Sequence, residues 1–133
     1  MVDFGGQMSE APQPMTRQLW ALSVTSERND GIAVLAVNGR LGTASSLALV
    51  EAISREIRAG YLRLLVDLAG VDYMSSAGLG ALEASARRVH ESRGELVLCA
   101  LSEPVRLVFD LAGLLSAFAI EPSRDAGLTR LRR

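Results

Sequence analysis

Two short and dominantly apolar runs, residues 64–68 and 96–101, place the strongest constraint on the fold of this chain. Each run is too short for a buried helix and lacks the alternation of a half-exposed strand, so both are typical of strands buried on two faces. Segments with helical periodicity precede the first run and separate it from the second. Strands that alternate with helices in this way predict parallel βαβ crossovers and an α/β domain.

The chain opens with a different pattern, that of a β-hairpin. Residues 19–27 and 32–37 are each apolar or alternating, and Arg28-Asn29-Asp30-Gly31 separates them. An Asp-Gly pair between two such runs is a strong hairpin signal. With a last short strand at residues 117–120, the pattern predicts a single domain with a mixed sheet of about four to five strands, an initial hairpin and about four helices.

Each expected helix has a recognisable start or an apolar face. The first has one apolar face, made of Leu47, Val50, Ile53 and Ile57. The second runs from Ser76 to about residue 92. Ser102 and Pro104 are suited to the start of a third helix, and Ser123 to the start of a final one.

The third of these helices is apolar almost all round. Its apolar residues are Val105, Leu107, Val108, Leu111, Ala112, Leu114 and Leu115. One face of a sheet cannot cover so wide an apolar surface. Three explanations stay open: the helix is wedged deeply in the core, its end overlaps the next strand, or part of it is an exposed patch for a partner or for a second copy.

Size and composition limit the classes of function. The 133 residues suffice for one domain, with residues 1–17 expected as a flexible tail and residues 18–133 as the folded unit. The net charge of −1 gives no electrostatic case for binding nucleic acid or an anionic membrane. The N-terminus lacks the pattern of a signal peptide, and no apolar run is long enough to insert into a membrane. We therefore expect a cytoplasmic protein.

The sequence offers little for catalysis. The only histidine, His90, lies about four helical turns after Ser76, too far away to act as its base. The single Cys99 lies in an apolar run and is expected to be an inert core thiol. Gly78 and Gly80 lack the third glycine of a dinucleotide-binding loop and are expected to let the helix pack closely on the sheet. We expect no enzyme, metal or cofactor, with a small nucleotide-binding enzyme as the weakest alternative.

Residues 67–82 join the end of a buried strand, a polar turn and the start of a helix at Ser75 and Ser76. Serine is among the best N-cap residues, so the pair can be explained as a cap alone. The N-terminus of a helix also favours negative charge, through its unpaired N–H groups and its dipole. A phosphoryl group on such a serine would add about −1.5 to −2 charges without opposing the fold, as a regulatory switch requires.

This region resembles the signature of a known family. The block Asp67-Leu-x-x-Val71-x-x-Met74-Ser75-Ser76-x-Gly78-Leu79 is similar to the signature of the STAS domain, the fold of bacterial anti-sigma factor antagonists. Residues 64–67 and Val37-Asn38-Gly39-Arg40-Leu41 resemble the same family in order and spacing. The similarity covers roughly residues 20–131.

The resemblance implies a partner-switching protein. In that family the unphosphorylated antagonist binds an anti-sigma factor that is also a serine kinase. The kinase phosphorylates the antagonist with ATP and so expels it, and a separate serine phosphatase resets the cycle. The phosphoacceptor position falls on Ser76, with Ser75 as the alternative. Ser75 and Gly42 stand where the family often has acidic residues, and Ala77 stands where it often has Ser or Thr.

The partner surface is expected to be centred on residues 71–77, with the turn of residues 39–46 and the exposed side of the following helix, because loops at the C-terminal ends of parallel strands cluster. Its expected members are Asp72, Met74, Ser75, Ser76, Ala77, Gly78, Glu83, Arg87, Arg40, Gly42 and Thr43. The runner-up function is a STAS accessory subunit of a membrane lipid or ABC transporter, or of a stress-signalling complex, without a phosphoswitch. A weak homodimer is a further option.

Overall fold

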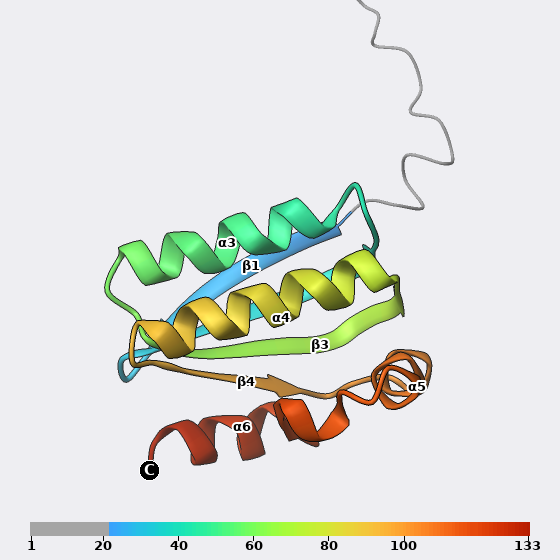
Figure 1. Ribbon diagram of the computed structural model, residues 1–133. Coiled ribbons are helices and arrows are strands. Elements are labelled where there is room, and N and C mark those ends of the chain that lie inside the picture. Colours follow the sequence, from blue (N-terminus) through green and yellow to red (C-terminus); the bar gives the residue numbers. More distant parts are fainter. Residues whose placement is uncertain (1–21) are drawn as a thin grey trace, which may run out of the picture.

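The computed structural model describes residues 22–133, so the tail expected at residues 1–17 lies outside the described part. The described residues form a five-stranded sheet in the order β1-β2-β3-β4-β5 (Figure 1). β1 (Leu22–Asn29) and β2 (Ile32–Leu41) are antiparallel, and β3 (Arg63–Met74), β4 (Glu95–Cys99) and β5 (Ala119–Glu121) continue the sheet in parallel. The predicted mixed sheet with an initial hairpin is confirmed.

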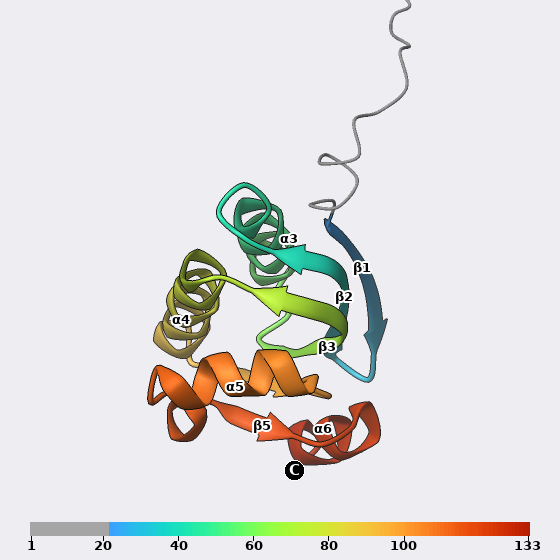
Figure 2. The ribbon, with the colours of Figure 1, turned by 90° about the vertical axis from the view of Figure 1, so that its right-hand side faces the viewer.

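Four α-helices accompany the sheet in the described residues, as predicted. They are α3 (Ser46–Arg58), α4 (Ser76–Glu91), α5 (Glu103–Leu111) and α6 (Arg124–Leu131). α3 and α4 lie side by side over one face of the sheet, and α6 covers the other face (Figures 1 and 2). α5 lies across the end of the molecule at which β2 and β3 finish.

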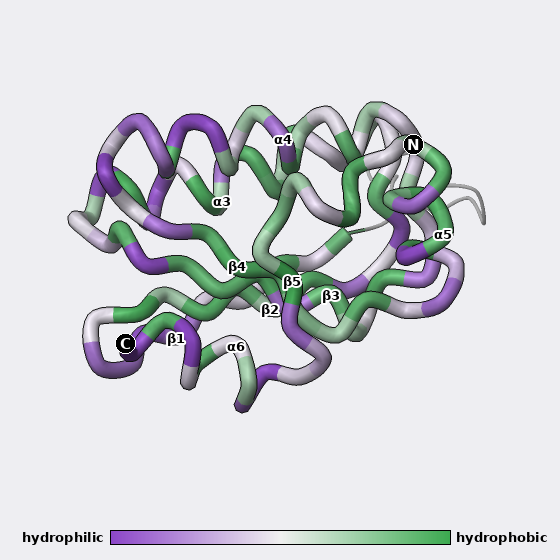
Figure 3. The backbone as a smooth tube through the Cα atoms, turned by 60° about the horizontal axis from the view of Figure 1, so that its bottom comes forward, coloured by the Kyte–Doolittle hydropathy of each residue, from purple (hydrophilic) through white to green (hydrophobic). Residues whose placement is uncertain are grey.

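The sheet separates two hydrophobic cores. The larger core joins the sheet to α3, α4 and α5, and the smaller one lies under α6 and contains Cys99. Burial raises the pKa of the Cys99 thiol to about 12, with the nearby Asp67 carboxylate as a second cause, so the thiol stays protonated and inert. Figure 3 shows hydrophobic residues concentrated along the central strands and hydrophilic residues at the turns.

The inner face of α3 differs from the prediction. Leu47 is 65% exposed, so the predicted apolar face was wrong at this residue. The buried residues of the helix are instead Leu49, Ala52, Ile53, Ser54 and Glu56. Glu56 is only 2% exposed and pairs with Arg28 of β1 at 2.9 Å. Apolar periodicity does not identify a carboxylate that is buried by pairing with a cation. The predicted buried face of α3 was therefore rotated relative to the face that the structure buries.

β3 is longer than predicted. The sequence indicated a strand at residues 64–68 followed by a polar turn, but residues 69–74 continue the strand to Met74. The register with β2 shifts twice over this stretch, as expected of β-bulges. The Asp67 carboxylate accepts a hydrogen bond from the N–H of Ala69 at 3.0 Å, which stabilises the irregular backbone. Polar residues that resemble a turn therefore belong to a bulged strand that leads directly to Ser75.

The apolar third helix divides into parts with different surroundings. Ser102 is its N-cap residue as predicted, although its hydroxyl donates to the Val71 carbonyl at 2.9 Å and accepts no hydrogen bond from the helix. The helix ends at Leu111, and Leu114 and Leu115 follow it as half-buried residues packed against the core. Val105 and Phe109 are buried on the inner face, whereas Leu107 and Leu111 are exposed on the outer face.

Candidate functional site

The candidate site lies at the edge of the sheet where β2 and β3 end and where α3 and α4 begin (Figure 2). The two strands are parallel, so their C-terminal ends meet. The N–H of Ser75 donates to the carbonyl of Leu41 at 2.9 Å and ties the start of α4 to the end of β2. Two helix N-termini are thereby held close to each other at one edge.

Gly78 permits this close approach. A Cβ atom at Gly78 would lie 2.7 Å from the carbonyl oxygen of Leu41 and 2.9 Å from its Cγ. Contacts this short would require α4 to move away from β2. A Cβ atom at Gly80 would meet nothing within 4 Å, so the expectation that both glycines allow close packing holds for Gly78 alone.

Ser75 and Ser76 have different surroundings. Ser75 is the N-cap of α4, and its hydroxyl oxygen accepts a hydrogen bond from the N–H of Gly78 at 3.3 Å. Ser76 is the first helical residue and is exposed. Within residues 22–133 its hydroxyl makes no hydrogen bond. The hydroxyl that another protein can reach is therefore that of Ser76.

A second serine pair, Ser45 and Ser46, begins α3 at the same edge. The Ser45 hydroxyl donates to the Arg40 carbonyl at 2.7 Å and accepts from the N–H of Gly42 at 2.9 Å. The Ser46 hydroxyl donates to the Thr43 carbonyl at 3.1 Å. Both hydroxyls therefore serve to hold the turn between β2 and α3.

The electrostatics of this edge favour an added negative charge. Neither α3 nor α4 has an acidic residue in its first turn, so no side chain there neutralises the positive ends of the helix dipoles. The Arg40 guanidinium stacks over the Tyr73 ring, 4.6 Å from its centroid. The nearest acid along the strand, Asp72, is exposed, and Asp67 pairs with Arg124 of α6 at 3.0 Å.

Most of the predicted site residues lie at this edge. The exposed or half-exposed ones are Asp72, Ser75, Ser76, Ala77, Arg40 and Thr43. Gly42, Met74 and Gly78 are buried, so they shape the edge and present no side chain to a partner. The edge thus offers small and mostly uncharged side chains around Ser76.

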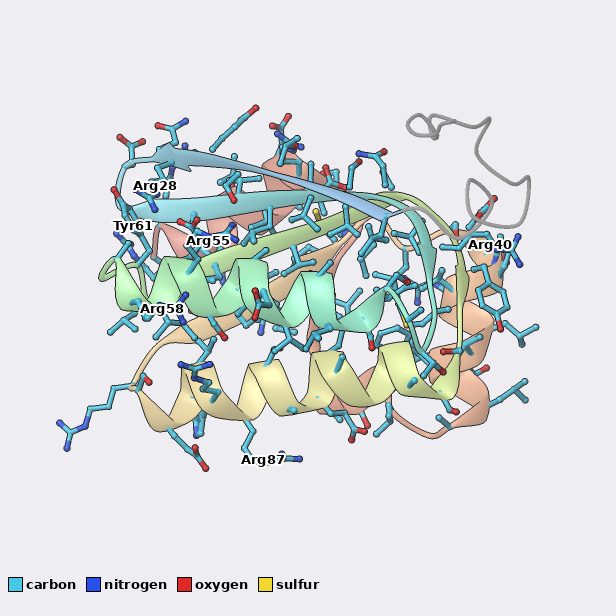
Figure 4. The ribbon with its side chains drawn as sticks, turned by 90° about the horizontal axis from the view of Figure 1, so that it is seen from above. Arg28, Arg40, Arg55, Arg58, Tyr61 and Arg87 are labelled. Carbon is cyan, nitrogen blue, oxygen red and sulfur yellow. The ribbon has the colours of Figure 1, made fainter. Side chains whose placement is uncertain are left out.

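Glu83 and Arg87 lie apart from this group. They follow Ser76 by about 10 Å and about 16 Å along the axis of α4. Together with His90 and Phe118 they line a pocket of about 350 Å³ between α4 and β5. Figure 4 shows Arg87 directed away from α4 and far from Arg40. The structure therefore does not bring the two residues together with the serines.

Two features of this edge escaped the sequence analysis. The first is the Ser45-Ser46 pair, although a second Ser-Ser before a helix is plainly visible in the sequence. The second is the position of α5, which no local signal places at this end of the sheet. Among the described residues no group of three His, Cys, Asp or Glu could hold a metal ion, and none of the helices is long and apolar enough to cross a membrane.

Comparison with known proteins agrees with this geometry. The sequence model of the STAS domain matches residues 23–127. The chain belongs to the STAS domain family. It is 34% identical to BtrV of Bordetella bronchiseptica, over 79% of this chain and 90% of BtrV. BtrV is provisionally named an anti-sigma factor antagonist. The family that the motif indicated is therefore confirmed.

Solved structures show the same fold. The crystal structure of an anti-sigma factor antagonist from Mycobacterium paratuberculosis superposes with a TM-score of 0.77 at 27% identity, over 85% of this STAS domain and 96% of that chain. Phosphorylated SpoIIAA of Bacillus, a cell fate determinant, superposes with a TM-score of 0.64 at 20% identity, over 83% of this chain and 100% of that chain. The latter similarity establishes the fold alone.

Proposed function

We propose that this STAS domain is an anti-sigma factor antagonist controlled by phosphorylation of Ser76. The unphosphorylated chain binds an anti-sigma factor that is also a serine kinase, in the cytoplasm. The kinase transfers a phosphoryl group from ATP to Ser76, and the complex separates. A serine phosphatase removes the group and restores binding. The names of the relatives support the antagonist role.

One observation carries the choice of Ser76. Four serines stand at the starts of α3 and α4, and three of their hydroxyls form hydrogen bonds within the protein. Ser76 is exposed, and its hydroxyl has no such bond among the described residues. A kinase can therefore use the Ser76 oxygen as a nucleophile without breaking a contact that holds the fold.

The chemistry of the transfer needs little from this chain. The Ser76 oxygen attacks the γ-phosphorus of ATP bound to the kinase, the bond to ADP breaks, and the hydroxyl proton passes to a base on the kinase. The product carries about −1.5 to −2 charges beside two helix N-termini, which the fold tolerates. A partner surface matched to a neutral serine would then lose affinity through desolvation and charge repulsion.

The surface proposed for the partner is the edge around Ser76. It includes Asp72 and Thr43, which are exposed, and Ala77 and Arg40, which are partly exposed. Glu83 and Arg87 would belong to it only for a partner that also extends along α4. Substitution of each of these two residues by alanine therefore measures how far the contact reaches.

Mass spectrometry of the phosphorylated chain tests the proposal. Each kinase-type anti-sigma factor encoded in the same genome is incubated with ATP and the purified chain, and the modified residue is found by fragmentation. We expect one phosphoryl group, on Ser76, and none on the Ser76→Ala variant. Label on Ser75 or Ser46 would contradict the assignment. An anti-sigma factor that binds tightly without phosphorylating the chain would contradict the switch.

A further inference from the structure

Apart from this site, α5 carries two exposed leucines. In the part of the chain that the structure describes, three large apolar side chains are exposed: Leu47 at 65%, Leu107 at 55% and Leu111 at 80%. Leu107 and Leu111 stand four residues apart, so they share one face of the helix. The parts of these side chains that remain in water add nothing to folding, and exposed apolar surface marks a binding site when it belongs to a larger patch rimmed by polar residues.

α5 is held firmly from its other side. Val105 and Phe109 are fully buried, and the Phe109 ring packs edge-to-face on Phe118 with the centroids 5.3 Å apart. At its start the Ser102 hydroxyl donates to the Val71 carbonyl at 2.9 Å, which ties α5 to the last part of β3. These contacts fix the outer face of the helix relative to the edge that carries Ser76.

We propose that Leu107 and Leu111 form an apolar anchor for the anti-sigma factor, beside the phosphoacceptor. This inference rests on the proposed function. α5 crosses the end of the sheet at which α4 begins (Figure 2), so α5 and Ser76 lie at the same end of the molecule. Arg106 and Asp110, which flank the leucines on the helix, are exposed. An apolar centre with a polar rim is the usual composition of a protein interface.

The size of the patch argues for this partner and against a second copy of the chain. A stable interface needs about 800 Å² from each protein, and two leucine side chains supply only a small part of that area. Combined with the edge around Ser76, they become the apolar part of a larger contact. Phosphorylation leaves the leucines unchanged, so the anchor and the switch contribute separately to affinity.

The experiment compares two double variants of the full chain. In one, Leu107→Ser and Leu111→Ser remove the apolar anchor, and in the other, Leu107→Met and Leu111→Met preserve it. Each is titrated calorimetrically with the anti-sigma factor that binds the wild type most tightly. We expect the serine variant to bind at least about tenfold more weakly, with a less negative heat capacity change, and the methionine variant to bind within about twofold of wild type.

The outcomes separate this inference from the proposed function. Thermal melts should differ by only a few degrees between the forms, because both leucines are largely exposed and serine is a slightly weaker helix former than leucine. If Ser76→Glu releases the anti-sigma factor but the serine variant binds like wild type, the anchor is overturned and the proposed function stands. If sedimentation shows a wild-type dimer that the serine variant dissociates, the occupant is a second copy. If no anti-sigma factor binds the wild type, the proposed function fails and the anchor with it.

Discussion

Two serine pairs begin two neighbouring helices at the same edge of the sheet, yet their hydroxyls differ in hydrogen bonding. Ser45 and Ser46 both hydrogen-bond to backbone groups of the turn that precedes α3. In the second pair Ser75 caps α4, while the Ser76 hydroxyl has no partner within residues 22–133. The residue types and their positions at the helix start are the same, but the backbone at Ser45 is helical with ψ −13°, whereas that at Ser75 is extended with ψ 172°. The difference therefore comes from the backbone that leads into each helix.

That difference separates a structural serine from an accessible one. The chain folds back before α3, so that the Arg40 carbonyl and the Gly42 N–H bond the Ser45 hydroxyl, and the Thr43 carbonyl bonds the Ser46 hydroxyl. The bulged end of β3 instead leads into α4 with no intervening turn, and the N–H of Ser75 already donates to the Leu41 carbonyl. Because the backbone before α4 is extended, the two serine hydroxyls can bond only to the helix itself, and the Ser75 hydroxyl already caps it. The second hydroxyl is therefore available to another protein.

The largest expected effect comes from placing charge on the accessible serine. Ser76→Glu should weaken binding of the cognate anti-sigma factor by about 100-fold or more, equivalent to about 2.7 kcal/mol, because a carboxylate must be desolvated at the contact. Ser92→Glu puts the same charge at the other end of α4, where Ser92 is exposed, and should change affinity less than about twofold. Calorimetric titration measures both. Equal affinity of Ser76→Glu and wild type would show that the accessible hydroxyl is not a switch.

The next effect tests the backbone contact that holds α4 at this edge. Gly78→Ala should lower the free energy of unfolding by about 1–3 kcal/mol, because its Cβ would lie 2.7 Å from the Leu41 carbonyl oxygen. Gly80→Ala is the matched control two residues later. It meets nothing within 4 Å and should raise stability by up to about 1 kcal/mol through helix propensity. Urea unfolding compares them, and similar losses would mean that the close approach is not what Gly78 provides.

The sequence was sufficient for the fold because its signals were local and agreed with one another. The Asp30-Gly31 turn, the runs around Leu65 and Val97 and the cap at Ser123 each predicted an element that the structure contains. The predictions that were wrong depend on distant partners. Glu56 is buried because of Arg28 on another strand, and β3 continues past Asp67 because β2 lies beside it.

The candidate site was only partly predictable for the same reason. The motif around Ser76 located the edge, and its family assignment is confirmed. Which hydroxyl is accessible depends on bonds to the preceding turn, and no residue pattern encodes these. The rules for helix caps treat Ser45 and Ser75 alike, whereas the structure gives the Ser45 hydroxyl two backbone partners and the Ser75 hydroxyl one.

A smaller effect is expected from the first serine pair. Ser45→Ala should lower the free energy of unfolding by about 1–2 kcal/mol, because it removes two hydrogen bonds and leaves the N–H of the buried Gly42 without its acceptor. Thermal or urea unfolding measures the loss. Ser46→Ala, which removes one exposed bond, should cost less than Ser45→Ala. The reverse order would contradict the view that Ser45 holds the turn.

The smallest effects belong to the second pair, and they decide whether its two serines differ as the geometry indicates. Ser75→Ala should lower the free energy of unfolding by about 0.5–1 kcal/mol, the low end for an N-cap, because its bond to the Gly78 N–H is long at 3.3 Å.

Ser76→Ala removes no bond that the described residues make and replaces serine by a better helix former. It should therefore leave the unfolding free energy within about 0.5 kcal/mol of wild type, in the stabilising direction. Ser76→Asp should also stay within about 1 kcal/mol, because a helix N-terminus favours negative charge. Paired urea titrations resolve these differences. A loss of more than 1 kcal/mol for Ser76→Ala would mean that this hydroxyl supports the fold, and phosphorylation there would then have to disrupt structure to act.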